Sequence, residues 1–136
     1  MSKYMKAAQQ EWTTATIRSI WEMQSATLWN DGHDIATRIY RVPKGLHFDR
    51  HRHFVFVQLF IVSGKYRIHE DGVGERVLEA GDIVFVQPGD VHTETALEDT
   101  VILSTKQLPD PVDKYNRFEA EERATASSGP APALNP

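Results

Sequence analysis

Two short segments that combine glycine with histidine constrain the fold of this 136-residue chain more than any other feature. His51 and His53 follow Gly45 by six and eight residues, and His92 follows Gly89 by three. Residues at i and i+2 of a β-strand point to the same face, so His51 and His53 are predicted to reach one ion together. A third imidazole from a distant strand would leave one coordination position open, as in catalytic metal sites.

The middle of the chain alternates short apolar stretches with glycine, proline or acidic turns, which predicts β-strands. Residues 35–42 form one such strand, and the nearly continuous apolar run at 54–62 predicts a strand buried on both faces. Shorter strands are expected at 65–68, 77–78, 83–86, 92–97 and 101–104. No helix is predicted before residue 110. The pattern indicates an all-β sandwich or barrel.

The predicted organisation has four parts. Residues 1–34 form an N-terminal arm with short strands, and residues 35–106 form the β-barrel. Residues 107–123 form a C-terminal arm that packs on the barrel, with one helical turn at 119–123. Residues 124–136, rich in alanine, serine, glycine and proline, form a disordered tail.

The glycine-histidine segments at 45–64 and 81–92 resemble the two sequence motifs of the cupin superfamily. This resemblance implies a cupin-type jelly roll that holds one divalent metal ion on His51, His53 and His92. It also implies a small-molecule substrate and a homodimer, with residues 1–30 and 106–120 as candidate arms between subunits. Imidazole-rich sites suit zinc or iron most, and manganese, nickel or copper as further options.

The chain departs from the cupin pattern at the glutamate ligand that usually follows the second histidine. The two usual spacings fall on Val57 and Gln58. With a bulge in that strand, Gln58 would turn inward and its amide oxygen would be the fourth ligand. Either residue removes one negative charge and makes the ion a stronger Lewis acid. His33 and then His47 are the alternative fourth ligands. In the second motif, Pro88 is displaced by one place and Ala96 replaces an asparagine.

Three further residues are candidates for catalysis. By resemblance, Arg38 and Tyr40 face the metal cavity and could hold or polarise substrate oxygens. Glu94 lies two residues after His92 and therefore faces the same way. A carboxyl group inside an apolar barrel should have a raised pKa, which suits general acid or base catalysis. The alternative is that Glu94 orients a histidine.

Composition excludes several classes of function. A formal net charge of -4 gives no electrostatic reason to bind nucleic acid. The absence of cysteine excludes disulfides and thiolate chemistry and fits a cytoplasmic protein. The N-terminus lacks the apolar run of a signal peptide, and no window is long and apolar enough for a membrane span.

Three functions remain open. The first is a cyclase or lyase that acts on a largely hydrophobic, oxygen-rich substrate, similar to aromatic polyketide cyclases, with the ion as Lewis acid. The second is an Fe(II) dioxygenase that cleaves a diketone or flavonol. The third is a non-catalytic binding module.

Overall fold

The computed structural model describes residues 2–17, 21–29, 34–111 and 114–127. Within these residues, a 3-10 turn at Ala7–Gln9 is followed by ten strands and one helix. The strands are β1 (Thr13–Ile17), β2 (Trp21–Trp29), β3 (Ile35–Val42), β4 (His47–His51), β5 (Val57–Ser63), β6 (Lys65–Glu70), β7 (Gly74–Glu79), β8 (Ile83–Val86), β9 (His92–Ala96) and β10 (Thr100–Gln107). The helix is α1 (Lys114–Ser127).

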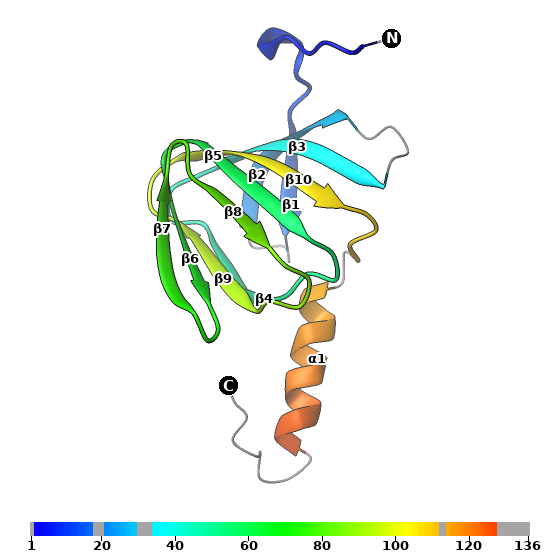
Figure 1. The fold of residues 1–136 in the computed structure, drawn as a ribbon, viewed down its shortest axis with the longest axis vertical. Helices are drawn as coiled ribbons and strands as arrows, with labels where there is room; N and C mark the ends of the chain where they lie inside the picture. The colour runs from blue at the N-terminus through cyan, green and yellow to red at the C-terminus, as the bar shows by residue number, and fades with distance from the viewer. Residues whose placement is uncertain (1, 18–20, 30–33, 112–113, 128–136) are drawn as a thin grey trace.

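The strands form two antiparallel sheets that face each other, as Figure 1 shows. The six-stranded sheet has the order β1-β2-β3-β10-β5-β8, and the four-stranded sheet has the order β4-β9-β6-β7. The predicted all-β jelly-roll sandwich is confirmed, and β3 has the predicted bounds. The expected N-terminal arm is not separate from the sandwich, because β2 pairs with β3 along most of its length.

The core lies between the sheets and is built from one face of each central strand. In β5, Val57, Leu59 and Ile61 are buried, whereas Phe60 and Val62 are exposed. The prediction that this strand is buried on both faces is therefore wrong. Its outer face is apolar but lies on the surface of the molecule.

Gly64 makes the tight turn between β5 and β6. Its φ angle is +95°, in the left-handed region, and a Cβ atom there would lie 2.4 Å from the carbonyl oxygen of Asp99. Both facts require glycine at the end of the first motif. This turn lets β5 and β6 belong to opposite sheets and encloses the core between them.

The C-terminal segment is more helical than the sequence predicts. Instead of one turn at 119–123, α1 runs from Lys114 to Ser127, so it also includes the first residues of the predicted tail. Residues 128–136 lie outside the described residues. Figure 1 shows α1 projecting from the lower end of the sandwich, and it contacts β4. Among the residues that the structure describes, no helix is long and apolar enough to cross a membrane.

Candidate metal centre

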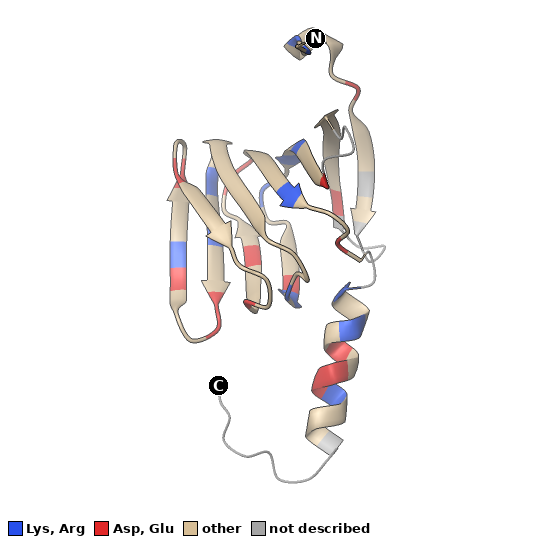
Figure 2. Cartoon of the chain, turned by 45° about the vertical axis from the view of Figure 1, so that its right-hand side comes forward, with Lys and Arg blue, Asp and Glu red and all other residues tan. Residues whose placement is uncertain are grey.

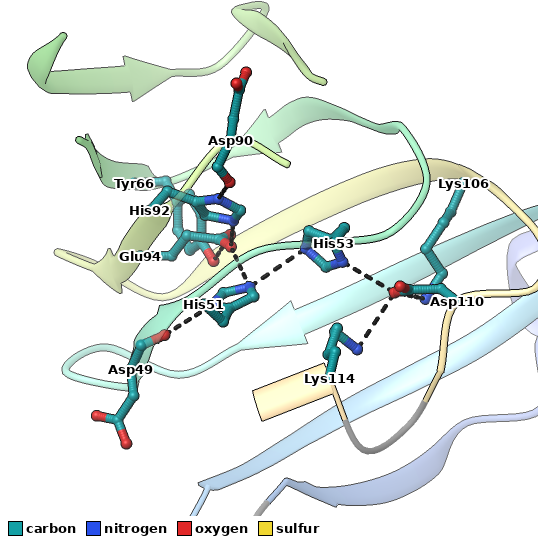
Figure 3. Close-up of polar contacts among 10 residues, drawn as sticks. All are labelled: Asp49, His51, His53, Tyr66, Asp90, His92, Glu94, Lys106, Asp110 and Lys114. Atoms are coloured by element: carbon teal, nitrogen blue, oxygen red, sulfur yellow. Dashed lines mark hydrogen bonds and ion pairs between the residues drawn. The ribbon is translucent and has the colours of Figure 1, made fainter. Parts of the chain in front are cut away.

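Three histidines and one glutamate meet between the sheets at the end of the sandwich where α1 begins. His51 ends β4, His92 and Glu94 lie on β9, and His53 lies in the segment after β4. One ligand atom from each side chain lies within 4.8 Å of the others. His51 and His92 are each only 1% exposed. Figure 3 shows the four side chains converging.

A β-bulge in β4 determines which residues of this strand point inward. Phe48 is opposite Glu94 and His51 is opposite His92, so β4 has one more residue than β9 between these pairs. Phe48 and His51 are therefore both buried. The bulge also turns His47 outward, where its Nδ1 lies 2.6 Å from Thr95 Oγ1. His47 therefore points away from the other histidines, and the prediction that it could be a fourth ligand is wrong.

Each histidine has an acceptor beside Nδ1, which leaves Nε2 to face the centre. His51 Nδ1 lies 2.7 Å from the carbonyl oxygen of Asp49. His92 Nδ1 lies 3.0 Å from the carbonyl oxygen of Asp90. A carbonyl oxygen only accepts, so in both rings Nδ1 carries the proton. The third ring, His53, has its Nδ1 2.9 Å from the carboxylate of Asp110.

The distances among the inner atoms suit a bound metal ion. His51 Nε2 lies 3.3 Å from His53 Nε2, and His92 Nε2 lies 3.0 Å from Glu94 Oε2. Two nitrogens bound about 2.1 Å from one tetrahedral ion lie roughly 3.4 Å apart. Two imidazole nitrogens facing each other without a shared proton repel, and a cation between them removes that repulsion. The four side chains therefore fit a divalent ion.

Electrostatics keeps two of the three imidazoles ready to act as ligands. Burial lowers the pKa of His51 to about 3, although the Glu94 carboxylate opposes this shift. Burial also lowers the pKa of His53. His92 differs, because its hydrogen bond to Glu94 and the charge of that carboxylate outweigh burial and raise its pKa. Neutral imidazole is the form that binds metal.

Glu94 is buried among hydrogen-bond donors. The Tyr66 hydroxyl donates to Glu94 Oε1 at 2.7 Å. Burial alone would raise the pKa of Glu94, but the hydrogen bond and charge of His92, together with His51 and Tyr66, lower it to about 2. The expected raised pKa is therefore wrong in direction. Glu94 lies with the ligand group as a carboxylate, and it supplies the negative charge that the first motif lacks.

The structure does not bring Gln58 into this group. On β5, Val57 lines the cavity beside the histidines, while Gln58 is opposite Phe85 and Thr105. Phe85 is more than half exposed, so this face of β5 is the outer one. β5 has an extra residue at Val62, beyond Gln58, so this bulge does not turn Gln58 inward. The bulge that affects the ligands is in β4. His33, the other alternative ligand, lies outside the described residues.

The two pocket residues expected on β3 differ in their placement. Tyr40 lines the cavity. Arg38 is opposite Ser104, which also lines the cavity, but Arg38 itself is not part of the lining. The Nε atom of Arg38 is buried and has no hydrogen-bond partner among the described residues.

Sequence reasoning missed Asp110, whose side chain is completely buried. Asp110 Oδ2 accepts from His53 and lies 3.3 Å from both Lys106 Nζ and Lys114 Nζ. Figure 3 shows this carboxylate between the two lysines, on the far side of the His53 ring from the metal group. A carboxylate that orients a metal-binding histidine is a common feature of metal sites. The signal in the sequence is an aspartate fixed between two prolines, Pro109 and Pro111.

The cavity over the metal group is small, about 120 Å³. Its wall is apolar apart from the three histidines, Glu94 and a few other polar side chains. Tyr115 of α1 covers part of the mouth, and its ring lies 4.5 Å from that of His51. A larger hollow of about 570 Å³ shares Met23 and Val42 with this cavity, but none of its lining residues belongs to the metal group. The metal group therefore belongs to the smaller cavity alone.

Comparison with known proteins shows which family the chain belongs to. Residues 2–110 match the family model described as the ChrR cupin-like domain. The chain belongs to this cupin family. The resemblance seen in the two glycine-histidine motifs is thus confirmed. No curated protein matches the chain in sequence.

Solved structures share the fold of this cupin at low sequence identity. The polyketide cyclase RemF from Streptomyces resistomycificus has a TM-score of 0.70 at 15% identity, over 82% of each chain. A predicted oxalate decarboxylase from Thermotoga maritima has a TM-score of 0.68 at 19% identity, over 79% of this chain and 100% of that one. An RmlC-like cupin from Shewanella frigidimarina has a TM-score of 0.64 at 22% identity, over 79% and 91%. Such identities support the fold alone.

Proposed function

We propose that this cupin is a metal-dependent enzyme of the lyase or cyclase type, acting on a carbonyl or enolate oxygen of a small molecule. The observation that carries the proposal is the convergence of three imidazole Nε2 atoms and the Glu94 carboxylate in one buried cavity. A divalent ion bound there supplies Lewis-acid polarisation of a substrate oxygen. The three histidines and Glu94 would hold the ion, and the substrate oxygen would be a further ligand.

The residues of the chain itself would bind and shield the substrate. Apolar walls from Val57, Leu59, Val86 and Ile102 exclude water from the cavity. The Tyr40 hydroxyl at the wall can hold a substrate oxygen or exchange a proton with it. Glu94 serves as a ligand in this proposal, with Tyr66 fixing its second oxygen.

The size of the cavity supports one of the two kinds of substrate in this class. About 120 Å³ equals the volume of roughly four water molecules in the liquid. Pockets for drug-sized ligands start at about 300 Å³. RemF, which shares the fold, is a polyketide cyclase, but a poly-β-keto chain exceeds the cavity found here. This favours a lyase-type reaction on a substrate of a few heavy atoms.

An Fe(II) dioxygenase is the second candidate. Its support is the donor set, since imidazole nitrogens with one carboxylate oxygen also suit Fe(II). The metal that the protein binds and the consumption of oxygen separate the two. Zinc without oxygen uptake favours the lyase, whereas iron with substrate-dependent oxygen uptake favours the dioxygenase.

Metal analysis of the purified protein tests the proposal directly. We expect about one equivalent of a transition metal, its loss in the His51→Ala/His53→Ala variant, and weaker binding in Glu94→Gln. His47→Ala is the matched control, because His47 is exposed on the same strand and points away from the centre. The proposal fails if the wild-type protein binds no metal after reconstitution, or if the double variant retains it.

A further inference from the structure

We propose that the substrate of this centre is a small carboxylate whose anionic end is bound by Lys106 and Lys114. This inference rests on the proposed function and adds the chemical class of its substrate. The carboxylate would carry a second oxygen that reaches the metal group, as in a 2-oxo or 2-hydroxy acid.

The charges on the cavity wall favour an anion. The charged side chains that line it are Lys106, Lys114 and Glu94. Glu94 belongs to the ligand group, so its charge is offset by the ion. The two ammonium groups remain as the fixed charges that a substrate meets, in a cavity with otherwise apolar walls, where charge interactions are stronger than in water.

The Asp110 carboxylate contacts both lysines and cannot neutralise the charge of both. Lys106 Nζ and Lys114 Nζ both lie 3.3 Å from the same oxygen, Asp110 Oδ2. The same oxygen also lies 2.9 Å from His53 Nδ1. Among the described residues, one negative charge therefore faces two ammonium groups. The cluster retains positive charge even with Asp110 ionised.

Both lysines are largely withdrawn from water. Their side chains are 17% and 13% exposed, respectively. Burial lowers the pKa of Lys114, although Asp110 opposes that shift. Each ammonium group is poorly hydrated and shares the Asp110 carboxylate with the other. A second anion would therefore stabilise both of them.

The lysines and the metal group line the same cavity. His53 forms the boundary between them, because its Nδ1 faces Asp110 while its Nε2 faces His51 (Figure 3). Lys106 lies on β10 and Lys114 begins α1, so a strand and a helix bring them together. A cavity of about 120 Å³ admits a molecule that spans these two ends and little more.

A matched pair of probes tests the proposal: pyruvate and pyruvamide, which differ by charge and scarcely in shape. Affinities are measured by calorimetry with metal-loaded protein and by protein NMR with metal-free protein. We expect pyruvate to bind at least tenfold more tightly than pyruvamide in both forms. In Lys106→Met and Lys114→Met that ratio should fall by roughly ten- to a hundredfold in the metal-loaded form, as for the loss of a charge-assisted hydrogen bond. Lys44→Met, at an exposed position outside the cavity, is the control and should keep the ratio.

The outcomes separate this inference from the proposed function. Equal binding of the two probes, or a pyruvate preference unchanged in both lysine variants, overturns the carboxylate site even if the protein holds metal. Absence of metal binding overturns the proposed function, while a lysine-dependent pyruvate preference in metal-free protein would still support the anion site. The ratio is internal to each protein, so partial loss of folding in a variant does not affect it.

Discussion

The three imidazoles of the centre are oriented by two different means. His51 and His92 each place Nδ1 against a backbone carbonyl two residues earlier in their own chain segment. His53 instead depends on the side chain of Asp110, which is 57 residues away. The first two orientations follow from local backbone geometry, whereas the third requires the C-terminal segment to be in place.

Asp110→Asn should therefore weaken metal binding, and of the three ligand histidines it should affect His53 directly. We expect about a tenfold or greater loss of metal affinity, as is typical when the partner of a ligand histidine is removed. Asparagine keeps the shape but loses the negative charge that stabilises the His53 orientation. Competition with a chelator measures the affinity, and imidazole 15N NMR shows which ring changes.

Asp99→Asn is the control for this prediction, because Asp99 accepts from the Lys44 backbone in a turn outside the cavity. Changes in the 15N signals confined to His53 would support a positioning role for Asp110. Equal changes at His51 and His92 would instead indicate a general loss of structure.

Residue spacing predicts part of this centre but not all of it. The i and i+2 rule places Glu94 on the same face as His92, as the structure shows. The rule gives no information on neighbours across the sheets, so the donors that lower the pKa of Glu94 were not predictable. Asp110 has no periodic relation to the histidines at all. The prediction that Gln58 is a ligand is wrong because residue spacing does not show which strand contains a bulge or where in the strand it lies.

The helix α1 supplies no ligand but lies against the centre. Its buried residues are Tyr115, which contacts the His51 ring, and Phe118, which lies under the Arg50 guanidinium. Ion pairs connect the same helix to the β4 end of the sandwich, Arg52 with Glu121 and Arg50 with Glu122. Exposed pairs of this kind contribute little. The two aromatic side chains should therefore provide most of the docking energy.

Tyr115→Ala should release α1 without unfolding the sandwich. Truncating a buried aromatic residue costs roughly 3–5 kcal/mol, and at the edge of the core this cost should appear mainly as helix undocking. Hydrogen exchange in α1 and around β4 measures the effect, with Asn116→Ala at the neighbouring exposed position as the control. Unchanged exchange in Tyr115→Ala would show that the helix is held by other contacts.

The sequence predicts the strands well and this helix poorly, for a physical reason. The β3 segment is followed by the turn residues Pro43, Lys44 and Gly45, and its bounds are predictable from the sequence. The helix has only two buried aromatic residues, three positions apart, among mostly charged and small residues. Such a weak apolar stripe does not predict a helix, because tertiary contacts supply most of its stability.

At the scale of the whole molecule, an apolar surface lies on the outer face of β5 and β8. It is formed by Phe60, Val62, Ile83 and Phe85, which are all 38–56% exposed. Figure 2 shows β5 and β8 without charged residues, whereas β7 and α1 carry both signs of charge. β8 is also the edge of its sheet. We propose that a second copy of the chain covers this surface, because two uncharged faces can meet without repulsion and an open strand edge can pair with its own equivalent.

This location differs from the arms expected at residues 1–30 and 106–120. In the structure β2 pairs with β3 of its own sheet, and the segment around Asp110 packs against its own metal centre. Both segments thus have partners within the same chain. The apolar run of β5 predicts complete burial within one domain. A sequence alone cannot distinguish burial within the fold from burial against a second copy.

Phe85→Lys should convert a dimer into a monomer. A lysine at the centre of an apolar interface would have to be buried without a partner, which is strongly unfavourable. Light scattering coupled to size-exclusion chromatography at micromolar concentration measures the mass of each species. Val77→Lys is the matched control, because Val77 is similarly exposed on β7 in the other sheet and its substitution should leave the dimer intact.

A wild-type monomer, or a Phe85→Lys protein that remains dimeric, would exclude this face as the contact. If instead Val77→Lys alone dissociates the dimer, the contact lies on the four-stranded sheet, and the apolar outer face of β5 would need a different partner.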